Sequence, residues 1–324
     1  MAESPEQVLP PPPSPNHRGS CGRLLLDNLN LPPGTSTYRY QGRDYAESAV
    51  HGETRLFEQD DTGARSEYVV FTHVPPEEVI CVPRRRQQQQ KEEENKSQRE
   101  EEEEGPDEEP PSTTTLLKNR NFTYLEDDRI LIVRMRTLSH ARPKFQFDRL
   151  LITKLNNMGL GDKIDGRVGA AVQGTTRTKA PDCSYAPRPL PAGRSDKWPS
   201  IVVEIGYSES PRKLESDAKW WLEESGGDVQ LALAIHIKRR TETIVMQWWE
   251  RVPSPTQSDP QRQLPRCVQE ITISKGAAGQ PATVPGAPLN LPFEKVFLRP
   301  RRGSDADLTF FDNELRSFAD GVWI

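Results

Sequence analysis

Two acidic side chains in this chain could do chemistry, because each interrupts a segment that otherwise has the composition of a β-strand. Asp182 lies in KAPDCSYA (residues 179–186), and Glu204 lies near the end of SIVVEI (residues 200–205). A proline-rich loop separates the two segments, and an antiparallel hairpin centred on Gly193 places Asp182 opposite Glu204. Like charges that face each other destabilise a sheet, so their repulsion has to be compensated.

A divalent cation would compensate both carboxylates at once. Mg²⁺ is commonly held by one or two carboxylates, with water and phosphate oxygens completing its coordination. Such an ion, with Mn²⁺ as an alternative, polarises a phosphodiester and generates a hydroxide nucleophile from water. The competing interpretation is structural: each carboxylate caps a strand end or pairs with a nearby arginine.

Hydrophobic periodicity predicts the strands and helices around this pair. Phe147, Leu151 and Leu155 recur at near-helical spacing and predict an amphipathic helix. A second helix is predicted between Pro211, which suits a first helical turn, and Gly226, which ends a helix. The remaining predicted elements are strands at residues 130–135, 229–237, 243–249, 268–274 and 291–298, a polar loop at 253–266 and a terminal helix at 313–319.

This order predicts an α/β fold, with a central mixed β-sheet flanked by helices, in one domain at residues 115–324. The strand at 229–237 has large apolar residues on one face and small ones on the other, so a helix is expected to cover the small face. Residues 68–71 and 79–82 also have a β-forming composition, and residues 21–83 are expected to form a small β extension.

The front of the chain is poor in residues that could form a core. Hydrophobic residues make up only 34% of the sequence, which also contains 30 prolines. Residues 1–20 are predicted to be a disordered proline-rich tail and residues 84–114 a disordered charged linker, and this N-terminal region could bind a protein partner.

Residues 91–109 hold eleven acidic and three basic residues, so without them the net charge changes from −5 to +3. A mildly basic remainder permits a nucleic-acid partner but does not require one.

Cysteine spacing and hydropathy limit the class of protein. The four cysteines, at positions 21, 81, 183 and 267, form no CxxC pair and predict neither a zinc site nor a disulfide framework. No apolar run approaches the ~20 residues that a membrane helix needs, and the first residues do not form a secretion signal. We therefore expect an intracellular protein, nuclear or cytoplasmic, that is not secreted and has no membrane partner.

Three segments of the chain resemble a known group of proteins. They are KAPDCSYAP, WPSIVVEIGYSES and DAKWWLEESGGDVQLALAIHI. They resemble uncharacterised eukaryotic proteins related to the restriction endonuclease group of the PD-(D/E)XK nuclease-like superfamily. Pro181 and Asp182 match the PD half of the motif, and Glu204 matches its (D/E) position. The resemblance implies a restriction-endonuclease-like fold and a Mg²⁺-dependent phosphodiesterase site.

The chain departs from this pattern at the catalytic lysine, which the superfamily places two residues after the Glu. That position is Gly206 in this chain. In related families the lysine can lie on the following helix, which here offers Lys213 and Lys219. Each has a structural alternative, because Lys219 could pair with Glu215 and Lys213 with Asp217 at the i, i+4 spacing of a helix.

Two further residues are candidates for the site that the resemblance implies. Lys179 lies just before the PD pair. Asp165 lies between the first helix and the strand pair, where the superfamily sometimes supplies another acidic metal ligand, although a turn residue is the plainer interpretation. The predicted metal ligands are therefore Asp182, Glu204 and Asp165.

Three functions compete at this stage. The first is a Mg²⁺-dependent nuclease in which Asp182 and Glu204 hold the metal and Lys213 or Lys219 assists the water. The second is a catalytically degenerate nuclease-fold module that binds nucleic acid or protein partners, which Gly206 favours. The third is a protein-interaction adaptor, supported only by the proline-rich and acidic segments.

Overall fold

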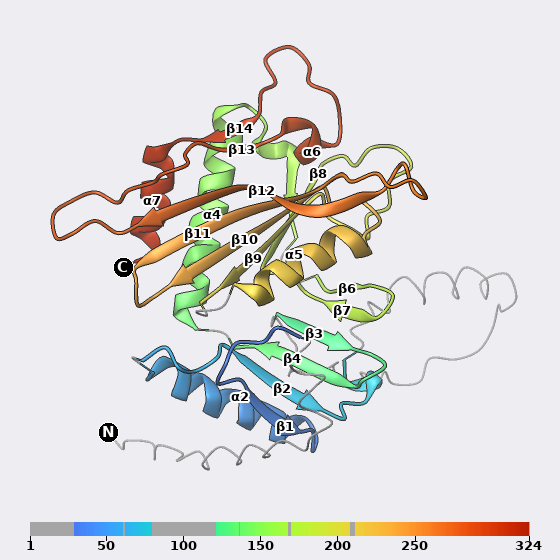
Figure 1. Ribbon diagram of the computed structural model, residues 1–324, viewed down its shortest axis with the longest axis vertical. Helices are drawn as coiled ribbons and strands as arrows, with labels where there is room; N and C mark the ends of the chain where they lie inside the picture. Colours follow the sequence, from blue (N-terminus) through green and yellow to red (C-terminus); the bar gives the residue numbers. More distant parts are fainter. Residues whose placement is uncertain are drawn as a thin grey trace, which may run out of the picture.

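The computed structural model describes residues 29–60, 62–79, 121–135, 137–167, 170–207 and 211–323. These residues form two six-stranded sheets and a short two-stranded one (Figure 1). The predicted tail at 1–20 and the predicted linker at 84–114 lie outside the described residues.

The larger sheet contains both strands of the predicted pair. Its strand order is β12-β11-β10-β9-β8-β5, and only the β9–β10 pair is parallel, so the sheet is mixed. Its strands are β5 (Ile164–Gly166), β8 (Cys183–Pro187), β9 (Ile201–Gly206), β10 (Leu231–Lys238), β11 (Thr243–Pro253) and β12 (Gln263–Ser274).

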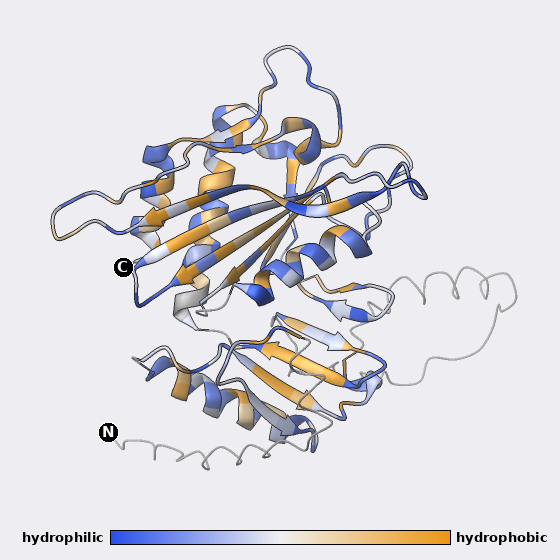
Figure 2. Cartoon of the chain, in the orientation of Figure 1, coloured by the Kyte–Doolittle hydropathy of each residue, from blue (hydrophilic) through white to orange (hydrophobic). Residues whose placement is uncertain are grey.

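Helices cover both faces of this sheet, as the alternation in β10 predicts. On one face, Ala232 and Ala234 pack against Ala218 and Trp221 of α5 (Arg212–Glu224). The small alanines let the helix approach the strands closely. In Figure 2, hydrophobic residues run along the strands, while the outward side of α5 is polar.

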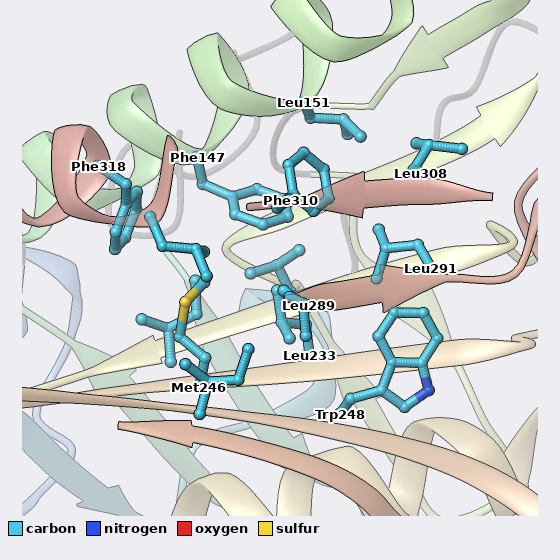
Figure 3. Packing of buried hydrophobic residues seen from close by; sticks show 14 of the residues in the cluster. Phe147, Leu151, Leu233, Met246, Trp248, Leu289, Leu291, Leu308, Phe310 and Phe318 are labelled. Carbon is cyan, nitrogen blue, oxygen red and sulfur yellow. The ribbon is translucent and has the colours of Figure 1, made fainter. Parts of the chain in front are cut away.

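The main core lies on the opposite face, between the sheet and the helices α4 (Leu138–Asn157), α6 (Phe293–Phe297) and α7 (Asp312–Val322). Phe147 and Leu151 of α4 point at this face and meet Leu233 and Met246 from the strands (Figure 3). Phe147, Leu151 and Met246 are fully buried. Burial of a side chain of this size contributes roughly 1.5–3 kcal/mol, so this cluster fixes the position of β9 and β10.

The smaller sheet has the order β1-β2-β4-β3-β7-β6. Its strands are β1 (Ser36–Arg39), β2 (Tyr68–Thr72), β3 (Phe122–Leu125), β4 (Ile130–Arg134), β6 (Val172–Gln173) and β7 (Arg177–Lys179). The parallel strands β1 and β2 are joined through α2 (Arg43–Glu58), which packs Ala46, Val50 and Phe57 against Phe71 and Leu131 on one face of this sheet. The sequence pattern did not predict this helix, because its buried positions are filled largely by alanine and valine.

Two sequence predictions near the C-terminus are wrong. Residues 291–298 were predicted as a strand, but only Leu289–Leu291 is one (β13, paired with β14, Leu308–Phe310), and α6 follows. Phe293, Val296 and Phe297 are all buried at helical spacing, and this packing overrides their β-forming composition.

The polar loop predicted at 253–266 is also shorter than expected. Strands β11 and β12 continue their ladder out to Pro253 and Gln263. The hydrogen-bonded ladder therefore includes residues of mixed polarity, which the sequence pattern assigned to a loop.

The predicted fold class, α/β with a mixed central sheet flanked by helices, is confirmed. The described residues also include the short 3₁₀ turns Pro76–Glu78 and Gly161–Lys163. Within the described ranges, no helix has the length and hydrophobicity needed to cross a bilayer.

Candidate functional site

The pairing of β8 with β9 has the register predicted from the sequence. Cys183 lies opposite Val203 and Ser184 opposite Val202 in an antiparallel ladder. Continued by one residue, this ladder brings Asp182 opposite Glu204. The side chain of Glu204 projects toward α5, where its Oε1 accepts a hydrogen bond from Trp221 Nε1 at 2.7 Å.

Both carboxylates converge on one cation, the guanidinium of Arg134. Arg134 Nη1 donates to Asp182 Oδ2 and lies 3.7 Å from Glu204 Oε2. Two further donors fix Asp182: Asn121 Nδ2 donates to Oδ1, and the backbone N–H of Ile205 donates to Oδ2 at 2.7 Å. The two acidic residues therefore face a shared point rather than opposite sides of the sheet.

The chain of charges continues through two lysines. Lys179 Nζ donates to Glu204 Oε1 and lies 3.0 Å from Asp217 Oδ2. Lys213 Nζ lies 2.5 Å from Asp217 Oδ1. Asp182, Arg134, Glu204, Lys179, Asp217 and Lys213 thus alternate in sign, and we call these residues the ionic cluster.

The cluster forms where one end of the smaller sheet meets the larger sheet and α5. Strand alternation places Arg134 on the same face of β4 as Ile130 and Ile132, away from α2. Lys179 ends β7, which is separated from β4 by β3 in the same sheet. The smaller sheet therefore supplies two cations, and the larger sheet supplies both carboxylates of the predicted pair.

Helix α5 supplies the remaining ion pair of the cluster, Lys213 and Asp217. Lys213 and Asp217 are separated by four residues and therefore lie on one side of the helix, next to the apolar stripe that packs on the sheet. The i, i+4 pairing of Lys213 with Asp217 was one of the sequence alternatives, but its burial was not foreseen, since both residues are at most 4% exposed.

Burial and neighbouring charges shift the pKa values of this cluster. Glu204 is 2% exposed, and this desolvation raises its pKa although Lys179 opposes the shift. Burial would also raise the pKa of Asp217, but Lys179 and Lys213 outweigh it and lower that pKa to about 2. Burial lowers the pKa of Lys213 to about 8, because desolvation and the nearby Lys179 outweigh the opposing effect of Asp217.

Gly206, the position where the motif would have its lysine, is tightly packed. A Cβ on Gly206 would lie 3.0 Å from Glu67 Oε1 and 3.1 Å from a methyl group of Leu214. Real Cβ contacts are rarely so short, so a side chain at this position would require Glu67 and Leu214 to shift by a few tenths of an ångström. Lys179, from a different sheet, supplies the amine next to Glu204 instead.

The other predicted residues lie apart from the cluster. Lys219 is on the exposed side of α5, and its Nζ lies 5.0 Å from the centroid of the Trp249 ring. Asp165 is exposed on the edge strand β5, opposite Ala186. The geometry therefore brings together Asp182, Glu204 and Lys213, but not Lys219 or Asp165.

A pocket opens onto the cluster. Its wall includes Arg134, Glu204, Lys179, Lys213 and Asp217, together with Tyr68, Asn121, Phe122, Thr123, Ile132 and Ala180. Most of these residues come from the smaller sheet. Sequence reasoning did not identify this wall, because it depends on strand pairing between segments far apart in the chain.

The donor set suits a divalent cation only in part. Within the described part of the chain, no group of three or more His, Cys, Asp or Glu side chains is arranged to hold a metal ion. Mg²⁺ needs only one or two carboxylates beside water and phosphate oxygens, and Asp182 and Glu204 already share one cation. An ion held by this pair would take the place of Arg134 Nη1.

Comparison with solved structures gives a likeness in fold. No protein-family pattern matches the chain, and no curated protein matches it. The fold is similar to the crystal structure of a candidate nuclease of the DUF820 family from Anabaena variabilis, with 13% sequence identity and a TM-score of 0.33, over 61% of this chain and 90% of that one.

Proposed function

We propose that this protein is a metal-dependent phosphodiesterase acting on nucleic acid, with its site at the ionic cluster. The observation that carries the proposal is the convergence of Asp182 and Glu204 on a single cationic point next to the amine of Lys179. The motif resemblance described above names the same acidic pair. Carboxylates that share a cation, beside a lysine, are the groups that metal-assisted phosphodiester hydrolysis requires.

Each residue has a distinct role in this proposal. Asp182 and Glu204 would hold Mg²⁺ or Mn²⁺, and a bound ion of this kind would polarise the phosphodiester and acidify a water molecule. Asn121 and the backbone N–H of Ile205 hold Asp182 in its orientation. Lys179, the amine next to Glu204, would position the attacking water.

Asp217 and Trp221 act through their neighbours. Asp217 Oδ2 lies 3.0 Å from Lys179 Nζ and keeps the ammonium directed at the carboxylates. The Trp221 N–H holds Glu204 Oε1 from the other side. We regard both as positioning residues, since neither is needed as a metal ligand.

A nicking assay tests this function. Supercoiled plasmid is incubated with the protein and Mg²⁺ or Mn²⁺, and the relaxed product is quantified. Asp182→Asn and Glu204→Gln are expected to reduce nicking to background, and Lys179→Met to reduce it by roughly 100-fold, the usual size of a lost acid–base or water-positioning group.

Lys219→Met and Asp165→Asn are matched controls, because they change the same residue types outside the cluster. They are expected to keep the full nicking rate. Circular dichroism melting of every variant separates a lost site from a lost fold. Nicking that persists in folded Asp182→Asn and Glu204→Gln, or wild-type protein that never nicks, contradicts the proposal.

A degenerate, purely binding module is the second candidate, and one observation favours it. The three carboxylates of the cluster are already matched by three cations, and all six residues are at most 6% exposed. In this case no nicking occurs. Nucleic acid would then bind without metal and with an affinity that falls steeply as salt rises.

A further inference from the structure

The Arg134 guanidinium lies between the two carboxylates that would hold a metal. Its Nη1 is bonded to Asp182 and is 3.7 Å from Glu204, and its Nη2 donates to the hydroxyl of Tyr68. The side chain is 5% exposed, and its Nε is buried without a hydrogen-bond partner.

A divalent ion held by both Asp182 and Glu204 would need the position of Arg134 Nη1, which is bonded to Asp182 and lies 3.7 Å from Glu204. Two cations cannot share one buried position, because like charges repel strongly there. Asn121 and the backbone N–H of Ile205 also hold Asp182, and Lys179 and Trp221 also hold Glu204, so neither carboxylate can turn away from Arg134 without breaking these contacts. A metal can therefore bind only if Arg134 leaves.

We propose that Arg134 is a built-in competitor of the metal, which lies at the cation position between Asp182 and Glu204 and must be displaced when an ion binds. This inference rests on the proposed function for the identity of the site. It goes further, because it assigns a regulatory role to a residue from the neighbouring sheet. Metal binding is then an exchange of one cation for another, and its affinity is set by how firmly Arg134 is held.

Calorimetric titration with Mn²⁺ alone, without nucleic acid, tests this exchange. Arg134→Met removes the competing charge and keeps an apolar stem in the same space. We expect its Mn²⁺ dissociation constant to be at least tenfold lower than that of the wild type. Adding Glu204→Gln to Arg134→Met should abolish the gain, because it removes half of the ligand pair.

Arg194→Met is the matched control. Arg194 is also a mostly buried arginine bonded to an aspartate, Asp228, but it lies away from the cluster. Its removal is expected to leave Mn²⁺ affinity unchanged. Equal affinity in the wild type and Arg134→Met, or a gain that survives Glu204→Gln, would overturn the inference.

Arg134→Met leaves two buried carboxylates without their shared cation and could prevent folding in the absence of metal. Arg134→Gln, which keeps an N–H donor for Asp182, is therefore measured in parallel. Refolding is followed by circular dichroism with and without Mn²⁺. Folding that Mn²⁺ restores supports the exchange, whereas two variants that Mn²⁺ neither binds nor restores contradict it.

The two proposals fail in different ways. Wild-type protein that never nicks DNA, together with Arg134→Met that binds Mn²⁺ tightly, contradicts the phosphodiesterase but keeps the exchange. Nicking by the wild type without improved Mn²⁺ binding in the Arg134 variants keeps the phosphodiesterase and contradicts the exchange.

Discussion

At the scale of single residues, the site depends on which side chain fills the volume around Glu204. The motif that this chain resembles has a lysine where this chain has Gly206. In the structure, the side chains of Glu67 and Leu214 lie close to Gly206. The amine next to Glu204 comes instead from Lys179, the end of a strand in another sheet.

Adding a side chain at Gly206 is therefore expected to destabilise the fold. Gly206→Ala should cost about 1–3 kcal/mol, the usual cost of overpacking, measured by urea unfolding. Gly166→Ala is the matched control on strand β5, where a Cβ would make only ordinary contacts at 3.8 Å, and it should change stability by less than about 0.5 kcal/mol. Equal effects of the two substitutions would contradict the packing argument.

Lys213 gives a prediction on pH dependence. Burial lowers its pKa from an ordinary 10.5 to about 8, so between these values the unfolded chain holds a proton that the folded chain has released. Stability therefore rises with pH in this window, by about 3 kcal/mol relative to Lys213→Met. Urea unfolding of both proteins at pH 7.5 to 10.5 measures the difference, and a pH-independent difference would argue against a charged, desolvated Lys213.

At the scale of elements, α5 connects the two sheets. Its apolar stripe packs on β10, and its Lys213 and Asp217 join the ionic cluster at the edge of that stripe. A shift of this helix would therefore move Asp217 and, through it, Lys179.

The close contact between α5 and β10 can be tested at Ala218. This residue is fully buried against Ala232 and Ala234. Ala218→Leu should destabilise the protein by about 1–3 kcal/mol and lower nicking by moving Asp217. Glu223→Leu, on the exposed side of the same helix, is the control, and it should leave both the unfolding midpoint and the nicking rate nearly unchanged. Full activity in Ala218→Leu would show that helix position does not control the cluster.

At the scale of the whole molecule, sequence reasoning reached what local patterns specify. It gave the β8–β9 pairing as the simplest hairpin centred on Gly193, although so long a loop does not fix the register, and it gave α4 and α5 from their apolar periodicity. It did not identify Arg134, because the run ILIVRM predicts a strand but not the sheet to which that strand belongs. Lys179 was noted only for its place in the sequence, since its contact with Glu204 depends on the packing of two sheets.

The smaller sheet also determines where this chain can be divided. Its strands β1 and β2 come from the first 72 residues and its strands β3, β4, β6 and β7 from residues 122 to 179, while α4 and β5, which belong with the larger sheet, lie between β4 and β6. A fragment that started at residue 115 would lose Tyr68 and the whole of α2. It would also leave β4 as an unpaired edge, with Leu131 and Val133 uncovered, which is a surface suited to strand-to-strand aggregation. Any truncated protein made for the experiments above therefore has to begin before β1.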